Sequence, residues 1–359
     1  MSEESNALPP DVVLSGVDLV KDFAARTSLF GSGSSMVRAV DGVSLELHRG
    51  RTLGLVGESG SGKSTVARML LRLVSVSEGK VLLNGDDVTD ARHTQLRTLR
   101  KSMQMVFQDP YSSLNPAMRV GEIISEPIAY HRSLKRAELA AEVDRILVSV
   151  GLSPEHARRF PDELSGGQRQ RVAIARALGP SPQIMVCDEA VSALDISIQS
   201  QILNLLLGLQ ADIGLSMLFV SHDLSVVRHV SHEIAVMYLG HVVELGPAGR
   251  VAEDPAHPYT QALLSAVPQA KPSTRRDREK IVLAGDPPSP SSRPKGCPFA
   301  SRCPYAFEPC HDIRPEHTPI DKGGTVACHL QTDGPVLSGR TLHGYSPLDL
   351  SNSARIVTT

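Results

Sequence analysis

Hydrophobic residues along the chain fall into two patterns, short continuous runs and stripes with helical spacing. Five short runs have the apolar composition of strands. They are Val12–Val20, Ser44–Leu47, Arg51–Val56, Ile184–Cys187 and Met217–Ser221. Between the last two runs, a stripe predicts an amphipathic helix; it consists of Ile198, Ile202, Leu205, Leu206 and Leu209. Strands that alternate with helices indicate an α/β fold with a largely parallel sheet.

The middle of the chain has the pattern of a helical subdomain. One helical face of residues 137–150 collects Leu139, Val143, Ile146, Leu147 and Val150. Residues 122–162 contain no strand pattern, so we expect helices over about residues 109–165, inside a domain that spans residues 1–270. Residues 64–73 are also predicted to be helical. The hydrophobic runs on either side of Gly240 and His241 predict a β-hairpin.

The two ends of the chain differ from this pattern. Residues 27–35 are rich in glycine and serine and predict a loop. Residues 285–296 are rich in proline and predict a linker, within a small C-terminal extension that we place at residues 271–330. The polar composition of residues 331–359 predicts a disordered tail.

Composition and charge narrow the class of protein. The 359 residues are 41% hydrophobic and 21% charged, as in ordinary soluble domains. A net charge of −2 gives no indication of a nucleic-acid partner. The sequence has no apolar run of about 18 residues, and its polar N-terminus lacks the features of a signal peptide. These observations predict a cytosolic protein.

A glycine-rich segment after the strand Arg51–Val56 fits the phosphate-loop pattern G-x-x-x-x-G-K-[ST]. Its glycines let successive N–H groups face one anion, and the following helix adds its positive dipole end. Lys63 is expected to reach the β- and γ-phosphates of a nucleoside triphosphate, and Ser64 to bind Mg²⁺. The residues predicted to surround the phosphates are Gly57, Glu58, Ser59, Gly60, Ser61, Gly62, Lys63, Ser64 and Thr65.

Two acids end the apolar strand at Ile184–Cys187. A buried strand delivers Asp188 to a metal at its carboxyl end, where α/β sheets place their ligands. Glu189 is then positioned to polarise a water as general base. The alternative is a strand that merely ends in solvated acids, and the phosphate loop upstream argues against it.

A second helix start can also bind an anion. The segment Leu164-Ser165-Gly166-Gly167-Gln168 has a serine N-cap and two glycines that expose backbone N–H groups. Taken alone, the segment fits a simple capped helix equally well. Its position between the phosphate loop and the acidic strand end favours the anion site.

The five cysteines are unevenly placed. Cys187 lies in an apolar run and is predicted to be a small core residue. The other four are Cys297, Cys303, Cys310 and Cys328, and in a reducing cytosol their grouping indicates a metal site more than disulfides. Four thiolates can hold Zn²⁺, and the adjacent His311 and His329 keep a mixed zinc site open.

Together these motifs resemble the nucleotide-binding domain of the ABC family over about residues 10–270. The phosphate loop matches Walker A, Asp188 and Glu189 match Walker B, and residues 164–168 match the family signature. Gln108 matches the Q-loop, Ser192 to Asp195 the D-loop, and His222 the switch histidine. Phe23 resembles the aromatic that stacks on adenine. One departure is Ala190, where the family usually has proline, and we expect it to loosen the turn slightly without abolishing activity.

The resemblance implies a P-loop NTPase (RecA-like) core with an N-terminal antiparallel β subdomain and a helical signature subdomain. It also implies head-to-tail pairs, with ATP between the phosphate loop of one subunit and the signature of the other. The signature residues Ser165, Gly166, Gly167 and Gln168, with Asp195, would then contact ATP bound to the partner. Gln108 would sense Mg²⁺ and the γ-phosphate. Glu189 and His222 would act on the attacking water, so that ATP hydrolysis is the expected activity.

Flanking segments resemble a narrower group, the ATPases of oligopeptide and dipeptide permeases. These segments are Leu53–Gly60, Val106–Pro116 and His257–Thr260. The four C-terminal cysteines resemble the [4Fe–4S] motif of the same group, with Zn²⁺ as the alternative. The resemblance implies two membrane permease subunits, a substrate-binding protein and a location at the cytoplasmic face of the membrane. The segment Thr52–Gly54 resembles the second of the two different ATPases that these transporters carry, which implies a different ATPase as the partner.

Three alternatives remain open from the sequence. Related systems import nickel or oligosaccharides, so the substrate is not fixed. A soluble ABC protein without a membrane partner usually carries two cassettes or a long coiled coil, and this sequence has one signature segment and no sustained heptads. A phosphate-loop kinase does not explain residues 164–168 or His222.

Overall fold

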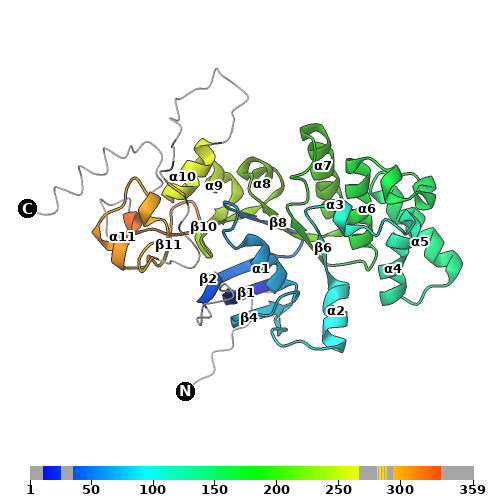
Figure 1. The fold of residues 1–359 in the computed structure, drawn as a ribbon, viewed down its shortest axis with the longest axis horizontal. Coiled ribbons are helices and arrows are strands. Elements are labelled where there is room, and N and C mark those ends of the chain that lie inside the picture. The colour runs from blue at the N-terminus through cyan, green and yellow to red at the C-terminus, as the bar shows by residue number, and fades with distance from the viewer. Residues whose placement is uncertain are drawn as a thin grey trace, which may run out of the picture.

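Two β-sheets organise the chain, with helices packed around them (Figure 1). The computed structural model describes residues 11–25, 35–266, 281, 283, 285, 286, 288 and 294–332. Residues 27–34 of the predicted loop, half of the predicted linker and nearly all of the predicted tail lie outside these residues, while Ser35 is described as the start of a strand.

The larger sheet has eight strands in the order β11-β12-β10-β9-β3-β8-β7-β6. The strands are β3 (Thr52–Val56), β6 (Met103–Val106), β7 (Ile184–Asp188), β8 (Ser216–Ser221), β9 (Glu233–Tyr238), β10 (His241–Pro247), β11 (His317–Pro319) and β12 (Thr325–Ala327). Pairing is parallel from β6 to β9 and antiparallel beyond it. The predicted parallel α/β core is therefore confirmed, and its phosphate-loop strand β3 lies inside the sheet.

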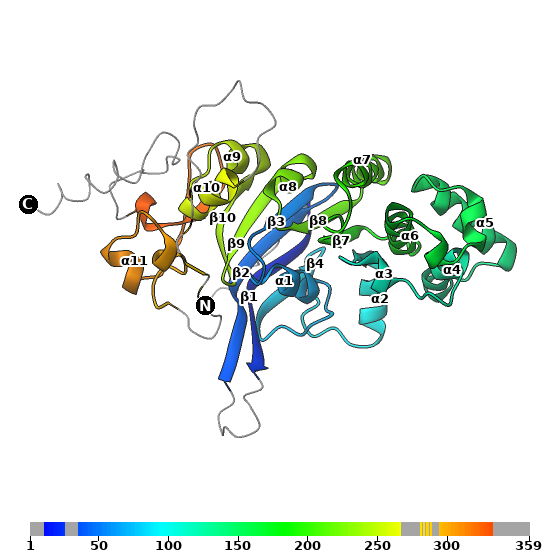
Figure 2. The ribbon, with the colours of Figure 1, turned by 45° about the horizontal axis from the view of Figure 1, so that its top comes forward.

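The smaller sheet is antiparallel, as expected for the N-terminal β subdomain. Its order is β2-β1-β4-β5. The strands are β1 (Val12–Ala25), β2 (Ser35–His48), β4 (Glu78–Leu83) and β5 (Asp86–Asp87). β1 and β2 form a long hairpin that projects from the body of the molecule (Figure 2).

Helices surround the larger sheet and form a group at one end of the molecule. The first helix, α1, follows the phosphate loop, and α6 follows the signature segment. From α1 to α6 the helices are α1 (Lys63–Leu70), α2 (Thr94–Ser102), α3 (Pro110–Ser113), α4 (Val120–His131), α5 (Arg136–Ser149), η1 (Pro154–Arg158), η2 (Pro161–Glu163) and α6 (Gly166–Leu178). The remainder are α7 (Ile196–Ile213), α8 (Leu224–Val230), α9 (Ala248–Glu253), α10 (Pro258–Ser265), η4 (Ala300–Arg302), α11 (Glu308–Asp312) and η5 (His329–Gln331). None of the helices in the described parts of the chain is both long and apolar enough to cross a membrane.

The helical subdomain forms as predicted. α4, α5 and α6 lie together beyond the edge strand β6, at the opposite end of the molecule from α11 (Figure 1). On α5, Val143, Ile146 and Leu147 are buried, as the helical stripe predicted. A fully buried aliphatic side chain of this size stabilises a fold by about 1.5–3 kcal/mol, so this stripe secures the subdomain.

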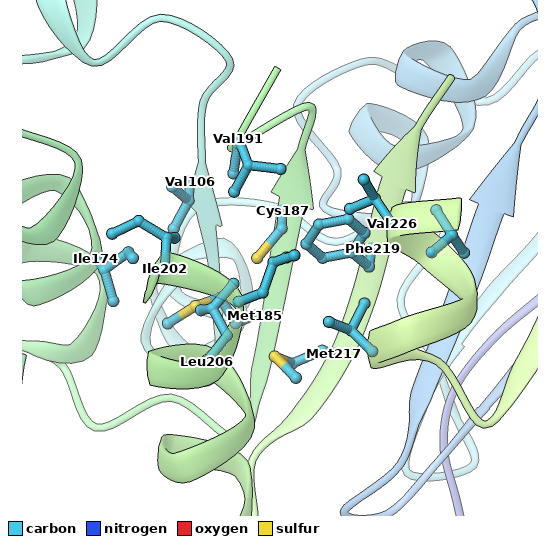
Figure 3. Packing of buried hydrophobic residues seen from close by; sticks show 14 of the residues in the cluster. Val106, Ile174, Met185, Cys187, Val191, Ile202, Leu206, Met217, Phe219 and Val226 are labelled. Carbon is cyan, nitrogen blue, oxygen red and sulfur yellow. The ribbon is translucent and has the colours of Figure 1, made fainter. Parts of the chain in front are cut away.

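The core between the sheet and α7 also follows the sequence pattern. Ile202 and Leu206 of α7 are fully buried against Met185 of β7 (Figure 3). Cys187 of the same strand has no exposed surface, and burial raises its pKa to about 12. The prediction of a small core cysteine is confirmed.

Several elements differ from the sequence prediction. The first phosphate-loop helix ends at Leu70 rather than residue 73, and Arg72 just beyond it is left-handed with φ 55°. β4 and β6 were not predicted. The hairpin between β9 and β10 is confirmed; Leu239 and Gly240, both with positive φ, form its two-residue turn.

Candidate functional site

The predicted phosphate loop joins β3 to α1. Its backbone is left-handed at Gly60 and Gly62, with φ of 78° and 102°. A Cβ on Gly62 would lie 2.6 Å from the carbonyl oxygen of Ala39, so glycine is needed there. α1 begins at Lys63 without a side-chain cap. The N–H groups of its first turn are therefore available to an anion.

Lys63 lies inside the phosphate loop with its side chain buried. Its Nζ donates to the carbonyl oxygens of Gly57 and Glu58, each at 2.8 Å. Burial lowers the pKa of this ammonium, and the charges of Glu189, Asp188 and Glu58 oppose that shift. The ammonium of Lys63 thus lies near acids at the end of β7, two strands away from β3 in the sheet, and near Glu58 of the loop itself.

Asp188 ends β7 beside the first turn of α1. Ser64 Oγ donates to Asp188 Oδ1 at 2.8 Å, and Arg68 Nη2 lies 4.0 Å from the other carboxylate oxygen. Burial raises the pKa of Asp188, while the hydrogen bond from Ser64 opposes the increase. A hydroxyl and a buried carboxylate in contact are the oxygen ligands that Mg²⁺ prefers.

Glu189 lies at the centre of a polar group drawn from three strands. Its Oε2 accepts a hydrogen bond from Gln108 Nε2 at 3.0 Å and lies 3.4 Å from Nδ1 of His222. The backbone of Glu189 is left-handed, with φ 50°, and its N–H donates to the carbonyl oxygen of Val220 at 2.9 Å. This sharp turn after β7 aims the carboxylate at residues that follow β6 and β8.

The signature segment lies apart from the phosphate loop. Ser165 caps α6: its Oγ accepts from the N–H of Gln168 at 3.3 Å, and its own N–H donates to Gln168 Oε1 at 3.0 Å. Ser165 and Gly166 are exposed. Among the described hydrogen bonds and ion pairs, none joins residues 164–168 to residues 57–65. The segment is therefore a second helix N-terminus that faces solvent within a single chain.

Two further residues that were predicted to contact ATP lie on the surface. Asp195 is exposed at the start of α7, where its side chain makes no capping hydrogen bond. Phe23 is on β1 with 41% of its surface exposed, and Lys21 Nζ lies 5.2 Å from its ring centroid. Phe30, the other aromatic nearby, lies outside the described residues. The structure does not bring Asp195 or Phe23 into contact with the group around Glu189.

The sequence did not predict the contacts on the outer side of the phosphate loop. The N–H of Glu58 donates to Tyr259 Oη at 2.8 Å. The carboxylate of Glu58 pairs with Arg302, whose Nη1 lies 2.9 Å from Oε2. Arg302 also donates to Tyr238 Oη at 3.4 Å. The only signal in the sequence was the segment His257–Thr260, which resembles the peptide-permease ATPases, and nothing singled out Arg302.

The C-terminal cysteines gather in one group near η4 and α11. Burial raises the pKa of Cys297 to about 11 and that of Cys303 to about 12, and charge on neighbouring cysteines adds to both shifts. The pKa of Cys328 is raised for the same reasons, with Cys310 among the contributing neighbours. The backbone N–H two residues further along donates to each of Cys297, Cys303 and Cys328.

These cysteines do not form a ligand set for a single ion. Among the described residues, no three Cys, His, Asp or Glu side chains are arranged to hold a metal ion. His329 Nε2 lies 2.8 Å from the carbonyl oxygen of Ile313, which occupies that nitrogen. The geometry on its own therefore supports neither the predicted iron–sulfur cluster nor a zinc site.

Comparison with known protein families matches two parts of the chain. Residues 40–192 match the family described as ABC transporter. Residues 243–310 match the family described as oligopeptide/dipeptide transporter, C-terminal region. The second match covers most of β10, the segment around Tyr259 and three of the four C-terminal cysteines.

Curated relatives extend over nearly the whole chain. A probable peptide ABC transporter ATP-binding protein of Sinorhizobium fredii is 47% identical over 89% of this chain and 90% of the relative. The oligopeptide transport ATP-binding protein AppF of Bacillus subtilis is 48% identical over 89% of this chain and 98% of its own length. OppF of Salmonella typhimurium, another oligopeptide transport ATP-binding protein, is 50% identical over 78% of this chain and 84% of its own.

Solved structures resemble the cassette part. A dimeric post-hydrolysis state of the ATP-binding cassette MJ0796, bound to ADP and Pi, has a TM-score of 0.58 at 28% identity. The match covers 66% of this chain and 98% of that structure. The structure of cbiO1 from Clostridium perfringens, part of an ABC transporter complex, has a TM-score of 0.58 at 27% identity and covers 67% of this chain and 90% of that one.

Proposed function

This chain belongs to the ATP-binding proteins of peptide ABC transporters, and we propose that the group around Glu189 performs the ATP hydrolysis that drives peptide import. The observation that carries the proposal is the convergence of Gln108 and His222 on the Glu189 carboxylate. A carboxylate held by two polar side chains is oriented to accept a proton from an attacking water. Asp188 and Ser64 lie beside it, at the position where the metal and the phosphates would be held.

The phosphate loop supplies the binding part of the reaction. Lys63 and the N–H groups of the first turn of α1 would hold the β- and γ-phosphates. Ser64, Asp188 and Gln108 would hold Mg²⁺, which neutralises negative charge on the phosphates during hydrolysis. His222 would hold the γ-phosphate and the water, and Phe23 would stack on the adenine. Thr65 would bind near the α-phosphate.

The signature segment would complete the site of a partner ATPase. Ser165 and the N–H of Gly167 are placed at a helix N-terminus that can receive the γ-phosphate of another chain. Asp195 is exposed at the start of α7 and would contact the partner too. The dimeric cassette MJ0796, bound to ADP and Pi, supports a paired arrangement. We propose a second, different ATPase as the partner.

The permease subunits would bind next to the Q-loop. A groove of about 420 Å³ lies between α2, β6 and α4. Phe107, Leu73 and Tyr130 line it and are exposed. A groove that combines exposed apolar side chains with charged ones such as Arg100 and Glu126 fits a short amphipathic helix of a membrane subunit. Two permeases would hold the ATPase pair at the cytoplasmic face of the membrane, with a substrate-binding protein reached only through them.

The C-terminal cysteines are proposed to bind a [4Fe–4S] cluster, with Zn²⁺ as the alternative. Their grouping and the N–H donors to three of the sulfurs support thiolate ligation. Each thiolate of such a cluster binds its own iron, so the sulfurs need not converge on one ion as zinc requires. Iron, sulfide and zinc analysis of anaerobically purified protein tests the proposal. Loss of metal in Cys303→Ser, but not in Cys187→Ser, is expected; metal-free native protein would contradict it.

The variant Glu189→Gln tests the proposed function. It keeps the shape and the hydrogen-bonding ability of the side chain but removes the base. We expect ATP binding to persist and hydrolysis to fall by about 10²–10⁴-fold, the usual contribution of a positioned base. Peptide uptake by the assembled transporter should fall in parallel. The matched control is Glu253→Gln, which changes an exposed acid on α9. Full ATPase activity in Glu189→Gln would refute the assignment.

A further inference from the structure

The C-terminal extension contacts the phosphate loop directly. Arg302 belongs to η4, between Cys297 and Cys303, and its side chain is 8% exposed. Its Nη1 lies 2.9 Å from Oε2 and 3.3 Å from Oε1 of Glu58, the second residue of the loop. An ion pair with a buried guanidinium is costly to break from one side, because the remaining charge loses its partner. The contact therefore constrains where the loop backbone lies.

Tyrosines from the body of the protein reinforce this contact. Tyr259 Oη accepts from the N–H of Glu58, and Arg302 donates to Tyr238 Oη. The rings of Tyr238, Tyr259 and Phe299 pack on one another with centroids 4.7–5.4 Å apart. Both the side chain and the backbone of Glu58 are thus fixed from outside the site.

A second connection reaches the same loop through the β9–β10 turn. Arg314 Nη1 lies 2.9 Å from Asp41 Oδ2. The N–H of Asp41 donates to the carbonyl oxygen of Gly240, and the N–H of Gly240 donates to that of Ser61, both at 2.9 Å. The extension therefore supports the loop at residues 58 and 61, on the two sides of Gly60.

We propose that Arg302 is a positioning residue for ATP binding, acting through Glu58. The loop has left-handed glycines at Gly60 and Gly62 and gains binding energy only while its N–H groups point at one anion. Glycines leave such a loop with many alternative conformations, and external contacts reduce the entropy lost when phosphate binds. The inference rests on the proposed function, because it assumes that ATP binds this loop.

Steady-state ATPase kinetics of the assembled transporter test the role of Arg302. Arg302→Met should raise KM for ATP by about tenfold, within the range known for misplaced binding groups, while kcat changes little. The affinity of the isolated chain for a fluorescent ATP analogue should fall by the same factor. The control is Lys322→Met, which removes an ion pair of the same extension, with Asp254, that does not reach the loop. An unchanged KM and affinity in Arg302→Met would overturn the proposal.

Two further variants separate positioning from general destabilisation. Arg302→Lys keeps the charge and should recover most of the ATP affinity. The double variant Glu58→Arg with Arg302→Glu reverses the pair and should bind ATP more tightly than either single reversal. If the single variants lose thermal stability and ATP affinity together, and neither Arg302→Lys nor the reversed pair restores affinity, Arg302 is only structural. Failure of the proposed function would instead appear as full activity in Glu189→Gln.

Discussion

The phosphate loop and the signature segment are both glycine-rich starts of helices, but they differ in how far the rest of the chain encloses them. The phosphate loop is enclosed: Lys63 is buried and bonds to the loop backbone. The signature segment is open, and its polar groups are satisfied locally by Ser165 and Gln168. One anion site is built within the chain, whereas the other is a surface ready to meet a ligand carried by a partner.

The glycines show the same contrast. Gly62 needs its left-handed backbone and has no room for a side chain. Gly166 has an ordinary backbone, and a Cβ there would meet only Leu194 Cδ2, at 3.8 Å. Glycine is therefore required by the fold at position 62, while at position 166 the fold would accept a small side chain. The isolated chain therefore places no steric requirement for glycine at position 166.

The largest expected effect on nucleotide binding is the loss of ATP affinity in Lys63→Met. Hydrogen bonds from a charged donor contribute about 1.5–3 kcal/mol each, so affinity should fall by about 10²-fold. Titration of the isolated chain with a fluorescent ATP analogue measures it. Lys80→Met, at an exposed position of β4, is the control. An unchanged affinity would show that the enclosed loop is not the nucleotide site.

Gly166→Asp tests the signature segment and should disrupt its contact with ATP bound to the partner. The new carboxylate has room, but it would repel a phosphate brought by the partner. We expect hydrolysis by the assembled transporter to fall by about 10²-fold, comparable to the loss of a group that stabilises transition-state charge. ATP binding by the isolated chain should not change. Gly249→Asp is the control, because a Cβ on this α9 glycine meets nothing within 4 Å. Reduced binding in the isolated chain would contradict an intermolecular role.

The alanine pair Gly62→Ala and Gly166→Ala compares the two glycines in the folded chain alone. Gly62→Ala places a side chain on a left-handed residue and against Ala39, and should lower the free energy of unfolding by about 1–3 kcal/mol. Gly166→Ala should change it by less than about 1 kcal/mol, since alanine favours the helix that starts there. Urea unfolding of the two variants and the native chain measures the difference. Equal losses would remove the distinction between the sites.

The smallest expected effect is that of Ala190→Pro, in the turn between β7 and α7. This turn joins the strand of the phosphate-loop site to α7, and Ile198 of α7 lies against Gly167 of the signature segment. Among the backbone hydrogen bonds described, none uses the Ala190 N–H, so proline removes no such bond. We expect the free energy of unfolding to change by less than about 1 kcal/mol, with ATPase activity retained. A large loss of activity, checked by thermal denaturation and ATPase assay, would show that alanine is needed here.

Most of the site could be predicted from sequence because its residues follow strands of one parallel sheet. Lys63, Asp188, Glu189 and His222 follow β3, β7 and β8, whose carboxyl ends meet at one edge. The pair of Glu58 and Arg302 could not be predicted, since 244 positions separate the two residues and neither lies in a pattern that implies contact. β4 was missed because its first three residues, Glu78 to Lys80, are polar or glycine and exposed.

The pairing of β12 with β10 has a practical consequence for work on this protein. Glu244 and Leu245 of β10 are paired with Val326 and Thr325 of the C-terminal extension. A chain cut after α10 would leave one side of β10 bare, with backbone groups free to recruit strands from other molecules. Shortened versions made to isolate the cassette are therefore expected to aggregate, and solubility trials should keep residues up to 332.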